Sequence, residues 1–501
     1  MSASREKKIR QEQAANGYVD PKIIREQEQR KAEKKSRLLY GSIALVFVVV
    51  AAALFVWQSG MIQRNVTALT IDDEKYTAAD VGYYKYSMYS QYYYYYAQMY
   101  GNGSYVQYFM TSDDLTDAAI EQMTHTQYVY EEALKNGYKL TDEDKQQMED
   151  IWANLESSAK SAGYSAKDYL KVLYGNTMTK KAYERNLEKA VIAASYSAQI
   201  EDGFTYTDAD LEKYYNENKN AFRYCSYEYF FVSSNPTVEN DADGNAIEPT
   251  ADEKAAAQKA AKDLADDVLA RIQNGEELKT VGEELKDKGN YNTFSGASYS
   301  DGAVMNWLFD ESRKEGDSDV IEVAETGYYV LLFHSCDRYD YNTIDVRHIL
   351  IAVDDSKLDS TSATYEADLA ALEAAAKAEA ETILKDWEAA GKSEADFADL
   401  ADEKSDDGAE GGLYEQVTKG YMVKEFEDWC FAEGRKAGDT GLVKTTYGYH
   451  IMYFVGQNDA YWAIQVEDTL RNNDYDKWFN SLAGEPTVTE GRGMEYVVSF
   501  Y

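Results

Sequence analysis

The chain has 501 residues and is strongly acidic, with 89 Asp and Glu against 51 Lys and Arg and a formal net charge of −38. Such a charge repels nucleic acid and anionic lipid head groups, so no nucleic-acid partner is expected. Three cysteines are too few for a disulfide scaffold.

Residues 1–37 form a basic segment, and the chain then becomes apolar. Residues 38–57 contain no charged side chain and are almost entirely apolar. A run of this length matches the ~30 Å hydrocarbon core of a bilayer, so one transmembrane helix is predicted at 38–58. Because the basic residues come first, the N-terminus is expected in the cytoplasm and the ectodomain outside a single-pass cell-membrane anchor. The alternative is a signal peptide cleaved near residues 51–53.

Residues 60–222 carry the pattern of a helical domain. Start signals of the capping-box kind, in which Thr precedes Asp by three positions, begin at Thr77, Thr141 and Thr207. A tyrosine-dense stretch occupies residues 83–108. Its rings could fill a helical core and its rim, or they could grip unfolded polypeptide segments.

From residue 223 onward the sequence contains two related copies of one pattern. A motif that begins with Trp307 recurs at Trp429, an offset of 122 residues, and continues each time to an Arg-Lys pair and a Gly-Asp pair. Each copy reads as a strand, an alanine-rich helix, shorter helices and paired strands, which predicts an α+β fold. The expected bounds are 223–340 and 343–458, followed by a helix over 462–482 and a short strand over 496–500.

Two of the four histidines occupy strand-like frames in the second copy. His348 lies in Val-Arg-His-Ile-Leu-Ile and His450 in Tyr-Gly-Tyr-His-Ile-Met-Tyr-Phe, so each imidazole is expected on a buried strand. The aligned positions of the first copy are Tyr229 and Tyr329. His125 and His334 lack a metal-ligand partner at useful spacing, so no metal site is expected.

The cysteines leave one disulfide open. Cys225 and Cys336 flank the outer strands expected in the first copy, where they could pair or stay reduced. Because the number of cysteines is odd, at least one of them stays unpaired.

The second copy resembles the parvulin family of peptidyl-prolyl cis/trans isomerases over about residues 345–456. The matching motifs are Val346-Arg-His348-Ile-Leu-Ile351, Phe397-Ala-Asp-Leu-Ala401, Ser405-Asp406-Asp407, Gly411-Gly412, the segment 420–427, and Thr445-Thr-Tyr-Gly448-Tyr-His450. The resemblance implies two tandem parvulin-like domains with antiparallel four-stranded sheets, of which the first is degenerate. More loosely, the ectodomain resembles extracytoplasmic foldases and chaperones of the PrsA, SurA and PpiD type. That likeness implies a SurA-like helical chaperone domain at 60–222, completed by 459–501.

Carried over residue by residue, the resemblance also implies a site. The implied catalytic residues are His348, Asp407, His450 and Thr445, and the implied substrate-binding residues are Met422, Phe426 and Tyr414. An X-Pro amide rotates over a barrier of ~18–20 kcal/mol without any bond being made or cut, so no cofactor or metal is required. The histidines are therefore expected to organise a polar network rather than to act as general acid and base.

The function that the resemblance implies is an isomerase and chaperone that assists folding of exported proteins. The alternative is a non-catalytic holdase that binds unfolded clients at the outer face of the membrane, and a third reading is an anchor that recruits partners there. The expected partners are unfolded or nascent exported polypeptides with X-Pro bonds. A homodimer is a further possibility.

Overall fold

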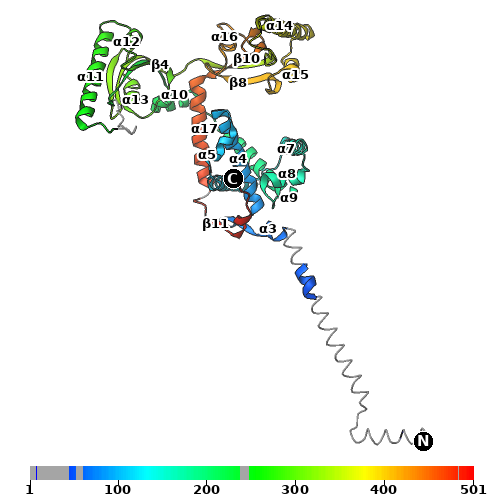
Figure 1. Ribbon diagram of the computed structural model, residues 1–501. Helices are drawn as coiled ribbons and strands as arrows, with labels where there is room; N and C mark the ends of the chain where they lie inside the picture. The colour runs from blue at the N-terminus through cyan, green and yellow to red at the C-terminus, as the bar shows by residue number, and fades with distance from the viewer. Residues whose placement is uncertain (1–6, 8–44, 52–59, 237–246, 483, 501) are drawn as a thin grey trace. The chain divides into compact units, whose positions relative to one another are not determined.

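The structure is a computed structural model that describes residue 7 and residues 45–51, 60–236, 247–482 and 484–500 (Figure 1). The chain divides into two compact units, one of Met1–Phe204 with Asp474–Tyr501 and one of Thr205–Asn473. The basic segment predicted at 1–37 and most of the span predicted at 38–58 lie outside the described residues. No helix within the described ranges combines the length and hydrophobicity that a membrane span requires.

The first unit is mainly helical, as the sequence predicted. Two of its hydrophobic clusters form around the start of α4, where one buries Leu69 and Met123 and the other buries Leu170 and Val191. Its helices are α3 (Met61–Asn65), α4 (Ala78–Tyr100), η1 (Gly103–Tyr105), α5 (Val106–Phe109), α6 (Ser112–Lys135), α7 (Asp142–Ser161), α8 (Ala166–Tyr174) and α9 (Lys180–Asp202).

The first unit also contains a three-stranded antiparallel sheet that the sequence did not predict. Its order is β11-β1-β2, formed by β1 (Thr67–Ile71), β2 (Glu74–Thr77) and β11 (Val488–Glu490). The strand predicted over 496–500 is wrong, because Tyr496 ends the 3₁₀ helix η4 (Arg492–Tyr496) and no strand follows among the described residues. The ring of Phe500 instead stacks on Tyr89 of α4 at 4.7 Å. The apolar residues of this segment thus contribute to packing and do not pair as a strand.

The predicted capping boxes begin α4 and α7 at Thr77 and Thr141, and α10 (Asp208–Glu217) of the second unit at Thr207. In α4, the carboxylate of Asp80 accepts the backbone N–H of Thr77 at 2.8 Å. Asp80 also accepts from the Asn186 side chain of α9 at 2.8 Å and forms an ion pair with Arg185. This buried carboxylate therefore joins the start of α4 to α9.

Replacing Asp80 with alanine is expected to lower the free energy of unfolding of the first unit by about 3 kcal/mol. The change removes a helix cap and leaves the Thr77 N–H and one of the two N–H groups of the buried Asn186 amide without an acceptor. Denaturant unfolding followed by circular dichroism measures the loss. Asp142→Ala is the control, because this first-turn carboxylate of α7 is fully exposed and its loss should leave the unfolding curve close to that of the wild type. Equal losses in the two variants would contradict the role assigned to Asp80.

The second unit contains two antiparallel four-stranded sheets with the same order of strands along the chain. The orders are β4-β3-β6-β5 and β8-β7-β10-β9. The elements around the first sheet are α10 (Asp208–Glu217), η2 (Lys219–Ala221), β3 (Tyr224–Ser233), α11 (Ala251–Gln273), α12 (Leu278–Glu284), β4 (Asn290–Ala297), α13 (Ala303–Leu308), β5 (Ser318–Val323) and β6 (Gly327–Asp337). Those around the second are β7 (Asn342–Ala352), α14 (Tyr365–Ala390), α15 (Glu394–Lys404), η3 (Glu410–Gly412), β8 (Leu413–Val417), α16 (Lys424–Cys430), β9 (Thr440–Lys444) and β10 (Gly448–Ala460).

Helix α17 (Tyr461–Leu482) follows β10 and confirms the helix predicted over 462–482. The boundary between the two compact units falls inside it, after Asn473. Trp462 and Val466 of this helix pack with Leu211 and Phe222 in the second unit. The structure thus places residues 205–222 with the sheets, although the sequence grouped them with the helical domain.

The two sheets share their pairing register at the positions that differ chemically. The cross-strand pairs are Tyr229 with Leu331 and Phe231 with Tyr329 in the first sheet, and His348 with Met452 and Leu350 with His450 in the second. The predicted alignment of two tyrosines with the two histidines is therefore confirmed at the level of the backbone.

The repeated tryptophan motif is a local packing unit in both copies. The guanidinium of Arg313 lies 4.4 Å from the ring centre of Trp307, and that of Arg435 lies 3.8 Å from that of Trp429. An arginine over an indole gains both a cation–π contact and burial of its aliphatic stem. The motif therefore makes the same arginine–tryptophan contact in both copies.

A disulfide bond joins Cys225 to Cys336. The two residues lie opposite each other on β3 and β6, which are the central strands of the first sheet and not the outer strands that the sequence suggested. Cys430 is buried and free.

Candidate active site

The two faces of the second sheet are covered by different helices. Ile349 and Ile351 of β7 pack in the cluster that contains α14 and α15, whereas Val346 and Met452 pack with α16. Because side chains alternate along a strand, His348 lies on the α16 face. The sheet thus positions this histidine beneath a short helix and away from the longer helices.

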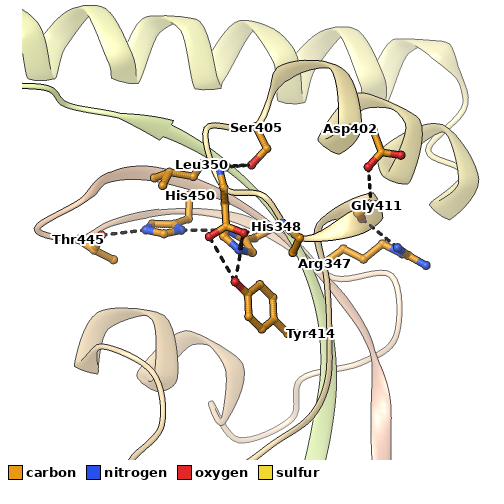
Figure 2. A network of polar contacts seen from close by, with 11 residues as sticks. Arg347, His348, Leu350, Asp402, Ser405, Gly411, Tyr414, Thr445 and His450 are labelled. Carbon is orange, nitrogen blue, oxygen red and sulfur yellow. Dashed lines mark hydrogen bonds and ion pairs between the residues drawn. The ribbon is translucent and has the colours of Figure 1, made fainter. Parts of the chain in front are cut away.

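His348 and His450 contact each other on the two central strands. Their Nδ1 atoms lie 3.0 Å apart (Figure 2). The side chains are almost fully buried, at 3% and 5% exposure. Neighbouring strands on both sides fix the backbone of each residue, so the pair is held in one geometry.

Three further polar groups extend the histidine pair into a row (Figure 2). The hydroxyl of Thr445 lies 2.8 Å from His450 Nε2. At the other end, His348 Nε2 lies 3.9 Å from a carboxylate oxygen of Asp407, which accepts a hydrogen bond from the Tyr414 hydroxyl at 3.1 Å. The row therefore runs from a hydroxyl, through two imidazoles, to a carboxylate.

The chemistry of these groups sets the direction of the hydrogen bonds. An ionised carboxylate only accepts, so the stable tautomer of His348 turns an Nε2–H toward Asp407 and leaves Nδ1 as an acceptor. The Nδ1–H of His450 then donates to it, and His450 Nε2 accepts from the hydroxyl of Thr445. Both hydrogen bonds of the row thus point toward the carboxylate end, the last step is a 3.9 Å electrostatic contact between His348 and Asp407, and both imidazoles are neutral.

The pKa values agree with neutral imidazoles. Burial chiefly, and then the neighbouring His348, lower the pKa of His450 to about 4. Burial also lowers the pKa of His348, although the nearby Asp407 opposes this effect. Burial and the same carboxylate raise the pKa of Tyr414 to about 12, so its hydroxyl stays protonated as a donor.

The free energy of unfolding should fall as the pH drops from about 6.5 to about 4. The direction of this change follows from the buried histidine pair. The folded state holds His450 neutral down to a pKa of about 4, whereas an unfolded histidine takes up a proton near pH 6.5. The unfolded state therefore binds more protons in this window, and the free energy of unfolding falls by on the order of 3 kcal/mol. Urea unfolding of the full chain at pH 7 and pH 4 measures it. His450→Gln should flatten the dependence, and an unchanged slope in that variant would contradict the assignment.

An apolar wall faces the histidines. The ring of Phe426 on α16 lies edge-on to both imidazoles, with ring centres 5.3 Å from His348 and 5.5 Å from His450. Phe426 is buried in a hydrophobic cluster against which Met422 and Tyr414 pack. The structure thus brings all seven residues predicted for the site into one region.

Sequence reasoning missed the residues that support this row. Ser405 Oγ accepts the backbone N–H of Leu350 at 3.0 Å and of Asp407 at 3.1 Å, which ties the carboxylate loop to the strand of His348 (Figure 2). Arg347 donates to the carbonyl of Gly411 at 2.9 Å and pairs with Glu394 at 2.9 Å. Both residues lie inside the motifs that resemble the parvulin family, and this position was the signal that could have identified them.

Position 412, in the loop that packs against the strand of His348, requires a glycine. Its φ of +61° lies in the left-handed region, and an added Cβ would meet the carbonyl oxygen of His348 at 2.2 Å. Only glycine allows the loop to approach the backbone of the strand that carries His348 so closely.

The other two histidines have partners of their own. His125 Nε2 lies 3.0 Å from the hydroxyl of Tyr475, and His334 Nε2 lies 2.9 Å from a carboxylate oxygen of Glu228. Among the residues that the structure describes, no group of three His, Cys, Asp or Glu is placed to hold a metal ion.

Comparisons with known proteins agree with this geometry. The family model of the PPIC-type PPIase domain matches residues 329–458, and that of the SurA-like N-terminal domain matches residues 24–196. The first of these ranges contains every residue of the site.

Curated relatives match only part of the chain. Foldase protein PrsA 1 of Listeria monocytogenes is 36% identical over 116 residues, which are 21% of this chain and 37% of that protein. Foldase protein PrsA of Exiguobacterium sibiricum is 38% identical over 79 residues, 15% of this chain and 25% of that protein. The chain thus spans little more than a third of the length of the first relative.

The crystal structure of PrsA from Bacillus subtilis aligns with 74% of this chain and 86% of its own, with 14% identity and a TM-score of 0.25. The family matches and the site geometry lead to one conclusion: the chain carries a PPIC-type PPIase domain and a SurA-like N-terminal domain.

Proposed function

We propose that the chain is an extracytoplasmic peptidyl-prolyl cis/trans isomerase and chaperone that assists the folding of exported proteins. The observation that carries the proposal is the buried, hydrogen-bonded pair His348 and His450, with Asp407 3.9 Å from His348 and Phe426 facing both rings. The match to the PPIC-type PPIase domain and the similarity to PrsA foldases support it.

The reaction needs a site that binds a twisted X-Pro amide better than a planar one. The barrier of ~18–20 kcal/mol comes from amide resonance, and no bond is made or cut. Phe426 and Met422 would receive the proline ring in their apolar wall. Binding energy from that contact stabilises the rotated state when the polar groups beside it match the turned carbonyl.

The polar row would serve as a preorganised wall of this site. Thr445, His450 and His348 would act in series to orient donors at Asp407, and Tyr414 would hold the carboxylate from the other side. Groups that are already oriented need no rearrangement when the amide turns, which is how such networks lower barriers. Neutral imidazoles suit this role, because a charge at the buried pair would break the one-way series.

The first copy, residues 223–340, would be a degenerate parvulin-like domain. It shares the strand order and the pairing register of the second copy, which would span 343–458. Tyr229 and Tyr329 hold the positions of the histidines, with ring centres 5.3 Å apart. Tyrosines there keep the bulk of the site but cannot relay hydrogen bonds through two ring nitrogens.

The remaining parts complete the proposed organisation. Residues 1–37 would lie in the cytoplasm and 38–58 would anchor the chain in the cell membrane. The first compact unit, residues 60–204 with 474–501, would form the chaperone domain outside it, in place of the bounds 60–222 and 459–501, with unfolded exported polypeptides as clients. The match to the SurA-like N-terminal domain supports this part.

Refolding of a client tests the enzyme against the holdase. The client is a denatured protein whose slow refolding phase is limited by X-Pro isomerisation, a step of tens to hundreds of seconds. A substoichiometric amount of the full chain is expected to accelerate that phase. A holdase without catalysis would reduce aggregation and leave the slow phase unchanged, and that result would contradict the proposed activity.

A further inference from the structure

The tyrosine-dense stretch divides into a buried half and an exposed half. Tyr84, near the start of α4, is 3% exposed and belongs to the core of the first unit. Toward the end of α4 and on α5 the side chains face solvent. Six of them are more than half exposed and form what we call the aromatic surface: Tyr94, Tyr95, Met99, Tyr100, Tyr108 and Phe109.

This concentration of exposed rings is unusual within the molecule. Elsewhere in the described chain from Gly60 onward, only Val172, Tyr421 and Tyr447 among the large apolar or aromatic residues are as exposed. Scattered exposure of that kind is normal, whereas a contiguous apolar patch marks an interaction site. Two segments of the first unit thus carry most of its exposed aromatic side chains.

Several rings of the aromatic surface pack against neighbouring rings. Phe109 of α5 stacks on Tyr100 of α4 with ring centres 5.7 Å apart, and on Tyr96 at 4.9 Å. Tyr95 packs edge-on against Tyr96 at 5.2 Å. Rings that are already ordered lose little conformational entropy on binding, which favours affinity.

The exposed charged side chains next to the aromatic surface along the chain are negative. Residues 86–112 contain no charged side chain, and no Lys or Arg occurs anywhere in residues 86–134. The first charges that follow are the exposed carboxylates of Asp113, Asp114 and Asp117 on α6. Lys85, the residue before this stretch, is buried and donates to Ser112 at 2.8 Å, so the exposed charges next to the stretch along the chain are acidic.

We propose that the aromatic surface is a docking site for unfolded polypeptide segments that carry Arg and Lys beside apolar side chains. The proposal rests on the client-binding part of the proposed function and names its chemistry. Ring faces attract cations, the acidic border adds a longer-range attraction, and the methionine and ring edges bury apolar side chains. Uncharged tyrosines suit clients of varied sequence, because contact through rings needs no fixed partner geometry.

The charges disfavour two other occupants. A second copy of the chain would bring the same acidic border against itself, and the chain as a whole carries −38. A membrane with anionic head groups would be repelled by the same carboxylates. A cationic, unfolded chain meets neither obstacle.

Peptide binding to the full chain tests the proposal. The probe is a fluorescent, proline-free peptide of about 20 residues rich in Arg and Leu, and its matched partner carries Glu in place of Arg. Tyr94→Gln/Tyr108→Gln changes the two most exposed rings, at 69% and 74% exposure, and should weaken binding of the cationic peptide about tenfold. The control is Tyr164→Gln, an exposed tyrosine of the same unit outside the aromatic surface, which should bind as the wild type does.

The outcomes separate the proposal from its alternatives. Three results together support it. Only the double variant loses binding, the wild type binds the acidic peptide more weakly than the cationic one, and high salt weakens binding of the cationic peptide. Equal binding by both variants overturns it, as does equal binding of both peptides. A fall in molecular mass of the double variant, or a loss of its adsorption to anionic vesicles, would assign the aromatic surface to self-association or to lipid instead. X-Pro isomerisation measured on the same variants should be unchanged, so its absence from all of them would refute the enzyme and leave the docking site standing.

Discussion

Replacing His348 with phenylalanine is expected to lower kcat/KM for isomerisation of X-Pro peptides by about a hundredfold. Phenylalanine keeps the ring and most of the volume at this buried position, but it accepts no hydrogen bond from His450. The Nδ1–H of His450 is then left without its acceptor, and Asp407 loses its nearest ring N–H. The fall should appear mainly in kcat, because Phe426 and Met422, which would bind the proline ring, are unchanged.

The first sheet supplies a matched control for this variant. Tyr229 lies opposite Leu331 in the register in which His348 lies opposite Met452. Tyr229→Phe therefore removes a polar group from the equivalent position of the other copy and should leave isomerisation unchanged. Equal activity of His348→Phe and Tyr229→Phe would contradict the assignment of catalysis to the second sheet.

Removing the disulfide should have the largest effect on stability. Cys225→Ser/Cys336→Ser opens a link between residues 111 positions apart, which in chain-entropy terms costs about 5 kcal/mol of unfolding free energy. The loss should be confined to the second unit, which contains the first sheet. Urea unfolding followed by tryptophan fluorescence of the second unit measures it, since Trp307 packs in the same cluster as both cysteines.

Reductant provides the control for the disulfide. It should destabilise the wild type to the level of the double variant and leave the double variant unaffected. Wild-type stability that is insensitive to reductant would show that the bond does not support the sheet.

Local signals in the sequence predicted local structure well. The capping boxes at Thr77, Thr141 and Thr207 mark true helix starts, because the Thr and Asp of each box satisfy N–H groups within one turn. The sheet that joins β1 to β11 was missed, because its partners lie more than 400 positions apart in the chain. Nothing in a single strand of three to five residues reveals such a partner.

Apolar composition alone misled the prediction at the C-terminus. Residues 496–500 look like a strand, but Phe500 stacks on the tyrosines of α4 and the backbone forms no ladder. For the tyrosine stretch, the sequence left open whether the rings fill a helical core and its rim or grip unfolded polypeptides. Burial of Tyr84 confirms the core for the first part of the stretch, whereas client binding by exposed rings such as Tyr94 stays a prediction.

The members of the candidate site could be found from the sequence, but their arrangement could not. Strand patterns placed His348 and His450 on a sheet, and the internal repeat exposed them as a difference between two otherwise similar copies. The donor direction from Thr445 to Asp407 depends on distances between atoms that are far apart in sequence. The support from Arg347 likewise appears only when α15 and η3 fold against β7.

The central claim is that the second sheet catalyses rotation about X-Pro bonds, and NMR exchange spectroscopy tests it most directly. The cis and trans resonances of a short X-Pro peptide interconvert over tens to hundreds of seconds without catalysis. With a substoichiometric amount of the full chain, exchange on the order of once per second or faster is predicted, and His348→Phe should abolish most of it. An exchange rate equal to that of the free peptide in the presence of the wild-type chain would contradict the account.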